Sequence, residues 1–166
     1  FKTSDYLGML RELGPQRLPL LQHTVWIDQP GEPGQDGMLR FSKLLASGKP
    51  DDPRIAQIGA MLKATDPINV QFTSGTTGFP KGATLTHRNI LNNGFFVGEC
   101  MALSPADRLC IPVPMYHCFG MVLGSLACLT HGSTIVFPND GFDPLTALEA
   151  VQAERCTGLH GVPTMF

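Results

Sequence analysis

Apolar residues recur along the chain at two spacings, and segments with one spacing alternate with segments that have the other. Helical spacing, with apolar positions three or four residues apart, is found over residues 6–13, 38–45, 54–63, 87–102, 117–130 and 144–154. Short apolar or β-branched runs, typical of strands, are found over residues 18–27, 67–73, 83–86, 108–113, 133–137 and 156–160. Strands that alternate with helices favour a mostly parallel sheet with helices on both faces. The sequence therefore predicts an α/β fold.

A segment rich in glycine and hydroxyl residues follows the predicted strand 67–73 directly. The ten residues from Thr73 to Gly82 include four hydroxyl side chains, three glycines and one lysine. Glycines let main-chain N–H groups approach phosphate oxygens closely, and hydroxyls add donors or join the ligand shell of a phosphate-bound Mg²⁺. Lys81 supplies a mobile positive charge. Because parallel sheets bind ligands at the carboxyl ends of their strands, we expect this loop to lie at such an end.

The spacing within this loop differs from that of the common nucleotide-binding loops. The pattern G-x-x-x-x-G-K-[ST] fails because Pro80 stands five residues after Gly75 and Gly82 follows Lys81. The dinucleotide pattern G-x-G-x-x-G is not met either. A loop of this composition can also be a plain flexible turn, so composition alone leaves both interpretations open.

The order of the ten residues resembles, position for position, the phosphate-binding signature of the adenylate-forming superfamily, which includes acyl-CoA synthetases, amino-acid adenylation domains and luciferases. Residues 83–89, 114–120 and 161–164 are similar to later landmarks of that family. Residues 1–13 are similar to the medium-chain branch of the fatty acyl-CoA synthetases. The resemblance implies an internal fragment of the large N-terminal AMP-binding domain, in which 1–65 form a lead-in of strand and helices and 66–166 a phosphate-loop α/β unit, without the small C-terminal domain.

The resemblance also implies a two-step reaction. In the first step the carboxylate of an acid, most simply a fatty acid, attacks the α-phosphate of ATP to give an acyl-adenylate and pyrophosphate, while Mg²⁺ neutralises charge. In the second step the thiol of coenzyme A displaces AMP. Family landmarks for adenine, ribose and the C-terminal catalytic lysine are absent, so we expect this chain to be inactive by itself. Two alternatives stay open, namely an enzyme that adenylates an amino or aryl acid and a non-catalytic nucleotide-binding module.

The family pattern assigns roles to the residues of the loop. Thr73 would contact the phosphates or Mg²⁺, and Lys81 would neutralise charge as pyrophosphate leaves. The β- and γ-phosphates would be held by the residues between them, which are Ser74, Gly75, Thr76, Thr77 and Gly78.

Two histidines are further candidates for the site. By the family pattern, His117 would lie near the carboxylate and the α-phosphate, whereas without the family it could merely cap or pack the start of a helix. His160 and Gly161 would border the acyl pocket. We interpret His23 and His131 as surface or turn residues and His87 as a helix-start residue.

The charge and composition of the chain limit the kinds of partner that it can bind. The hydrophobic share is 43%, which is ordinary for a globular chain, and the net charge of −2 gives no broad attraction to nucleic acid or to an anionic membrane. The longest apolar run, 118–129, is shorter than the roughly 20 residues that span a bilayer, so we expect a buried helix and no transmembrane segment.

The five cysteines are odd in number, form no Cys-x-x-Cys pair and stand in apolar segments. We interpret them as small buried thiols in a reducing compartment, either cytoplasmic or mitochondrial.

Overall fold

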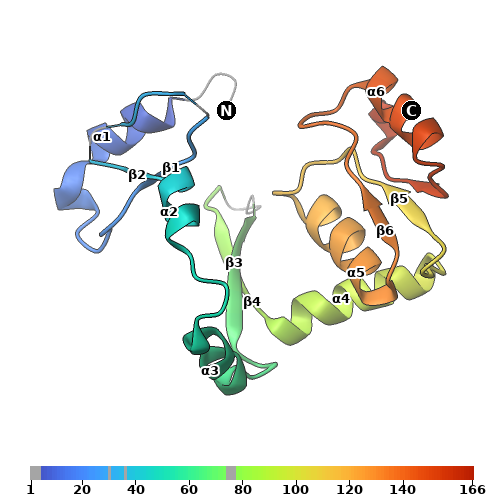
Figure 1. The fold of residues 1–166 in the computed structure, drawn as a ribbon, viewed down its shortest axis with the longest axis horizontal. Coiled ribbons are helices and arrows are strands. Elements are labelled where there is room, and N and C mark those ends of the chain that lie inside the picture. Colours follow the sequence, from blue (N-terminus) through green and yellow to red (C-terminus); the bar gives the residue numbers. More distant parts are fainter. Residues whose placement is uncertain (1–4, 30, 36, 74–77) are drawn as a thin grey trace. The chain divides into compact units, whose positions relative to one another are not determined.

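The computed structural model describes residues 5–29, 31–35, 37–73 and 78–166 (Figure 1). By its internal contacts the chain divides into two compact units, Phe1–Ala60 and Met61–Phe166. Each unit is described by itself below. The candidate site residues all belong to the second unit.

The first unit contains short helices and one pair of very short strands. Its elements are α1 (Tyr6–Arg17), β1 (Val25–Trp26), β2 (Leu39–Arg40), α2 (Phe41–Ser47) and α3 (Pro53–Met61), whose last residue passes into the second unit. The Asp5 carboxylate accepts a hydrogen bond of 2.9 Å from the Gly8 N–H and so caps α1. The helix kinks at Gly14, where φ is +61° and a proline follows.

Two sequence predictions for the first unit are wrong in extent. The strand predicted over 18–27 is reduced to Val25–Trp26, which pairs in parallel with β2. Among the described residues only β2 pairs with this segment, and Pro19 has no N–H to donate to a ladder. The helix predicted from residue 38 begins at Phe41 because the two residues before it belong to β2.

The second unit opens with a β-hairpin. β3 (Pro67–Thr73) and β4 (Lys81–Thr86) are antiparallel, and the glycine-rich segment joins them. The predicted strand 67–73 is confirmed, and the strand predicted at 83–86 begins two residues earlier. The pair is antiparallel because the connection is too short for the crossover that parallel neighbours need. The prediction that the glycine-rich loop follows a strand of the parallel sheet is therefore wrong, since the loop joins two antiparallel strands of a separate two-stranded sheet.

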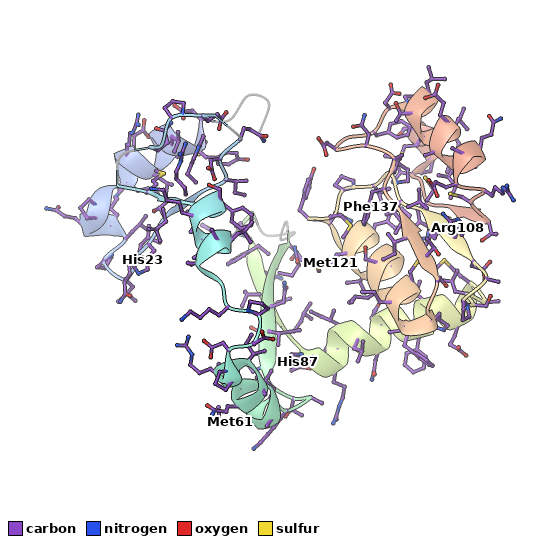
Figure 2. All side chains as sticks on the ribbon, viewed as in Figure 1. His23, Met61, His87, Arg108, Met121 and Phe137 are labelled. Carbon is purple, nitrogen blue, oxygen red and sulfur yellow. The ribbon has the colours of Figure 1, made fainter. Side chains whose placement is uncertain are left out.

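The long helix α4 (His87–Cys100) follows the hairpin without a break. The Thr86 hydroxyl accepts from the Asn89 N–H while the Asn89 side chain accepts from the Thr86 N–H, which makes a reciprocal cap at the helix start. Figure 2 shows His87 at this junction. Farther along, a Cβ on Gly94 would lie 2.7 Å from the Leu126 Cβ, so α4 packs closely on the following helices at this glycine.

The remainder of the second unit is a parallel three-stranded sheet with helices. Its elements are β5 (Arg108–Cys110), η1 (Phe119–Leu126), α5 (Ala127–His131), β6 (Thr134–Val136), α6 (Pro144–Ala153), β7 (Gly158–Leu159) and η2 (Pro163–Met165). The strand order is β6-β5-β7, and both pairs are parallel. The predicted strands at 108–113, 133–137 and 156–160 and the predicted helix at 144–154 are all found, each somewhat shorter than predicted.

Side chains alternate along the central strand, and this alternation shows how the sheet is covered. Leu109, Ile111 and Val113 form a buried cluster with Cys128 of α5. Cys110 points to the other side and is fully buried, and α6 contacts β5. An ion pair between Arg108 (Figure 2) and Glu154 joins the start of β5 to the end of α6. Helices therefore cover both faces of the sheet, and the α/β prediction with a mostly parallel sheet is confirmed.

The apolar helix predicted over 117–130 is present in an unusual form. Its first part, η1, is a π-helix, and α5 continues it. The Ser125 hydroxyl donates to the carbonyl of Gly120, five residues earlier, at 3.1 Å. A Cβ on Gly120 would lie 2.5 Å from the Pro114 carbonyl oxygen, so only glycine fits at this position. None of the helices in the described ranges is both long and apolar enough to cross a membrane.

Two further expectations are corrected. Cys110 and Cys128 are buried and Cys156 is half-buried, but Cys100 and Cys118 are exposed. Burial raises the pKa of the Cys110 thiol to about 11.

His131 is not a surface residue. Its side chain is 8% exposed, and its Nε2 lies 3.0 Å from the Glu99 carboxylate. Its ring also stacks on Phe95, with centroids 5.2 Å apart. His131 is buried because α4 and α5 pack against each other.

Candidate functional site

The hairpin brings two of the predicted site residues together. Thr73, the last residue of β3, is the register partner of Lys81, the first residue of β4. Directly opposed residues of a ladder point to the same face, so the hydroxyl and the ammonium group lie on one face of the hairpin beside the loop. Both residues are exposed.

The loop itself is only partly described. Ser74, Gly75, Thr76 and Thr77 lie outside the described residues. Gly78 is exposed and has φ +86°, a backbone conformation that favours glycine. The backbone conformation therefore explains why the residue at position 78 is a glycine.

The two faces of the hairpin differ in chemistry. Continuing from the Thr73–Lys81 pair, the same face carries the pairs Gln71–Ala83 and Asn69–Leu85, and Gln71 and Asn69 are half-buried. The opposite face carries Val70 and Phe72, which are 55% and 67% exposed. Of the predicted phosphate-binding residues, Thr73 and Lys81 are thus placed on the more polar face of the hairpin.

His117 lies at the end of a tight turn that follows the central strand β5. Its N–H donates to the Pro114 carbonyl at 3.1 Å, and its own carbonyl accepts from the Met121 N–H at 3.0 Å. The side chain is exposed, but its Nδ1 accepts a hydrogen bond of 3.1 Å from the Phe119 N–H. The capping role that the sequence left open is therefore present, and it leaves the other ring nitrogen without a hydrogen bond to the described residues.

His160 follows β7, the strand next to β5. Its N–H donates to the Cys110 carbonyl at 2.9 Å, and its ring lies on Phe119 with centroids 4.9 Å apart. Its Nε2 lies 3.4 Å from the Met101 Sδ, while its Nδ1 is buried and has no hydrogen-bond partner among the described residues. Burial lowers the pKa of His160, so the ring stays neutral near pH 7.

Both histidines lie at the carboxyl edge of the parallel sheet. His117 follows the end of β5 and His160 follows the end of β7, which are paired strands. This edge is where open α/β sheets bind their ligands. The structure thus brings His117 and His160 to one place, on either side of Phe119.

A pocket of about 300 Å³ opens beside His160. Its lining is apolar apart from this histidine and includes residues of α6, β7 and η2 and the segment after β5, namely Pro112, Phe142, Pro144, Ala147, Leu148, Leu159, His160, Met165 and Phe166. Gly161 does not line it. A Cβ on Gly161 would lie 2.8 Å from the Phe166 ring, so this glycine allows the chain end to fold back over the strand.

Phe119 is a further candidate site residue, to which the sequence assigned no role of its own. It packs on the buried cluster of β5, contacts the ring of His160 and donates its N–H to His117. The available signal was an aromatic residue two positions after the histidine of the turn, within the family landmark 114–120.

The predicted contact with Mg²⁺ depends on the hydroxyl oxygen of Thr73. Over the described ranges, no group of three or more His, Cys, Asp or Glu side chains could hold a metal ion. The Thr73 hydroxyl is an oxygen ligand of the kind that Mg²⁺ accepts when phosphates supply most of its shell.

Comparison with known proteins identifies the family. A family model described as "AMP-binding enzyme" matches residues 16–166. The mitochondrial medium-chain acyl-CoA ligase ACSF2 of Homo sapiens is 39% identical over 184 aligned residues, covering 100% of this chain and 29% of the relative. The chain spans less than a third of the length of these curated relatives, between 17% and 29%.

Solved structures agree in fold. ATP-bound MatB from Rhodopseudomonas palustris has a TM-score of 0.56 at 34% identity, over 63% of this chain and 20% of that one. MbtA from Mycobacterium smegmatis has a TM-score of 0.71 over 93% of this chain and 27% of its own, at 24% identity, which is evidence of fold alone. The match of the family model over nearly the whole chain shows that this chain belongs to the AMP-binding enzyme family.

Proposed function

We propose that the complete protein carrying this sequence is an acid–thiol ligase that activates a carboxylic acid, most simply a fatty acid, with ATP and transfers the acyl group to coenzyme A. A carboxylate oxygen attacks the α-phosphorus of ATP, the bond to pyrophosphate breaks, and the thiol of coenzyme A then displaces AMP. One observation carries the proposal: a hydroxyl and an ammonium group, Thr73 and Lys81, oppose each other at the mouth of a glycine-rich loop in a chain of the AMP-binding family.

Catalysis of the first step, formation of the acyl-adenylate, depends mainly on positioning the reactants and neutralising the charge of the phosphates. Lys81 would neutralise negative charge as pyrophosphate leaves, and the loop residues 74–78 would donate hydrogen bonds to the β- and γ-phosphates. The Thr73 hydroxyl would join the ligand shell of Mg²⁺, which supplies further charge neutralisation when bound. Because preformed donors need no reorganisation during the reaction, such a loop stabilises the transition state more than water does.

His117 and His160 would form the acid-binding side, and Gly161 would border it next to His160 without lining the apolar pocket. His117 and His160 lie at the carboxyl edge of paired strands, where a carboxylate and the α-phosphate would meet. The exposed position of His117 and the apolar pocket beside His160 fit an anionic group and a hydrocarbon group, respectively.

The placement of the chain within the larger protein is part of this proposal. Residues 1–65 would form a lead-in and residues 66–166 the phosphate-loop unit of the large AMP-binding domain. We also propose an intracellular location, cytoplasmic or mitochondrial, which agrees with five unpaired thiols and with the mitochondrial name of the human relative.

The experiment is a pyrophosphate-release assay on the complete protein with ATP, Mg²⁺ and a panel of acids: octanoate, palmitate, cinnamate and a mixture of amino acids. We expect release with octanoate or palmitate, and acyl-CoA and AMP when coenzyme A is added. Release with cinnamate or an amino acid alone would support the second candidate, an adenylating enzyme for another acid. Nucleotide binding without release from any acid would contradict a ligase and favour a non-catalytic module.

A further inference from the structure

The hydrogen bond between the Phe119 N–H and His117 Nδ1 determines where the imidazole proton is held. A main-chain N–H can only donate, so the Nδ1 that it reaches at 3.1 Å must be unprotonated. The neutral ring then carries its proton on Nε2. The Cys118 Sγ lies 3.7 Å from the same Nδ1, and a thiol in that position acts as a second, weak donor.

The rest of the surroundings holds this arrangement in place. Phe119 is anchored twice, on the buried β5 cluster and against the ring of His160. The main chain of His117 is tied on both sides, to the Pro114 carbonyl and to the Met121 N–H. The donor and the acceptor are therefore both attached to the packed part of the unit, although the imidazole itself is exposed.

The outer nitrogen is left available for a ligand. Within the described part of the chain, Nε2 of His117 makes no hydrogen bond, while Nδ1 is engaged. An Nε2–H group is a donor, and a carboxylate and an α-phosphate are both acceptors. A general base would need an unprotonated Nε2, which the Phe119 N–H disfavours because the ring would then need its proton on Nδ1.

We infer that Phe119 is a positioning residue whose main-chain N–H fixes His117 as the Nε2–H tautomer, so that His117 donates a hydrogen bond to the anionic reacting groups and does not act as a base. This inference rests on the proposed function for the identity of the anion. A ring nitrogen held in one protonation state by the hydrogen bond at the other nitrogen is a general way to orient histidine.

Two substitutions of His117 separate the capping function of Nδ1 from the donor function of Nε2. Asparagine places an acceptor where Nδ1 lies and is a good N-cap residue, but it has no donor at the Nε2 position. Glutamine can place an amide N–H near the Nε2 position but loses the short cap. His117→Asn should keep the thermal midpoint of the wild type and lose about 10²–10³-fold in pyrophosphate release. His117→Gln should have the lower thermal midpoint and the higher activity of the two.

The tautomer is measured directly by nitrogen-15 NMR of the complete protein with labelled histidine at pH 8, the His117 signals being identified by their loss in His117→Asn. A pyridine-type Nδ1 with a pyrrole-type Nε2 is the expected result. A pyrrole-type Nδ1, or two protonated nitrogens, would overturn the assignment whatever the activity.

The kinetic outcomes distinguish this inference from the proposed function. Pyrophosphate release by the wild type with an Asn variant as active as the wild type, or more active than the Gln variant, would overturn the donor role and leave the ligase function standing. A wild type that releases no pyrophosphate from any acid would overturn the proposed function and remove the anion that the donor serves. In that case the NMR result still decides the tautomer.

Discussion

Thr73 and Lys81 are partners in the last register pair of the β3–β4 hairpin before its glycine-rich loop. Residues that are eight positions apart in sequence are thereby set side by side on one face. The strands are paired without interruption from Asn69 to Thr73, so the backbone on which the hydroxyl and the ammonium group stand is held on both sides, while the residues between Thr73 and Lys81 belong to the loop. This relationship determines which substitutions should affect nucleotide chemistry and which should not.

Removal of the Lys81 charge should slow adenylation. Lys81→Ala removes a cation at the point where negative charge grows as pyrophosphate leaves, and we expect a loss of about 10²–10³-fold in the rate of pyrophosphate release by the complete protein. Lys63→Ala is the matched control, since Lys63 is also exposed and belongs to the same unit. Equal rates for the two variants would show that Lys81 does not contact the reacting phosphates.

Thr73→Val should change the Mg²⁺ dependence of the reaction. Valine is as compatible with a strand as threonine but has no oxygen ligand, so we expect the Mg²⁺ concentration for half-maximal pyrophosphate release to rise. Thr84→Val is the control, because Thr84 pairs with Val70 on the opposite face of the hairpin. A rise that is the same in both variants would indicate a general effect on the hairpin.

Gly94→Ala should destabilise the second unit. The added Cβ would lie 2.7 Å from the Leu126 Cβ and 3.1 Å from the Leu126 carbonyl carbon, so α4 must move away from η1 and α5. We expect the free energy of unfolding in urea to fall by about 1–3 kcal/mol. Gly59→Ala on α3 meets nothing within 4 Å and should be neutral or stabilise by up to ~1 kcal/mol. An unchanged free energy of unfolding in Gly94→Ala would show that α4 does not pack closely on η1 at this position.

Asp107 should make stability depend on pH at the acid end. The Ser104 hydroxyl donates to it at 2.7 Å and the Thr157 hydroxyl at 2.8 Å, and these bonds, with the Ser104 N–H, lower the pKa of Asp107 in the folded state. A lowered folded pKa gives stability that is present above the unfolded value of about 3.9 and is lost as the pH falls through the folded pKa.

The variant that tests this prediction is Asp107→Asn, in which the amide N–H₂ group would face the hydrogen-bond donors of Ser104 and Thr157 and could not accept from them. We expect a lower thermal midpoint than wild type at pH 7, with the difference shrinking as the pH falls below about 4. A difference that stays constant from pH 7 to pH 3 would mean that the hydrogen-bonded carboxylate is not its cause. Thermal unfolding followed by circular dichroism over that pH range provides the measurement.

Local pattern was sufficient for much of the second unit. The strand 67–73 is found where its apolar and β-branched residues predict it, because those residues suit an extended pleated backbone wherever they lie. The cap at Thr86, the alternation along β5 and the loop composition are likewise short-range features. The family was also readable from ten consecutive residues, because their order resembles the family's phosphate-binding signature position for position.

Other features depended on residues far apart in the sequence. The first unit shows this for the strand predicted at 18–27, since a strand persists only where a partner supplies hydrogen bonds, and β2 supplies them to Val25 and Trp26 alone. The burial of His131 depends on α4, whose Glu99 is 32 residues away.

The candidate site shows the same division. The sequence by itself determined the residue types of the site: the hydroxyls, the lysine and the two histidines. Only the tertiary structure decided that Lys81 faces Thr73, that Phe119 lies between His117 and His160, and which imidazole nitrogen of His117 makes no hydrogen bond to the described residues. The physical reason is that hydrogen bonds and ring contacts are set by distances in space, and parallel pairing of β5 with β7 is what brings residues 117 and 160 to the same edge.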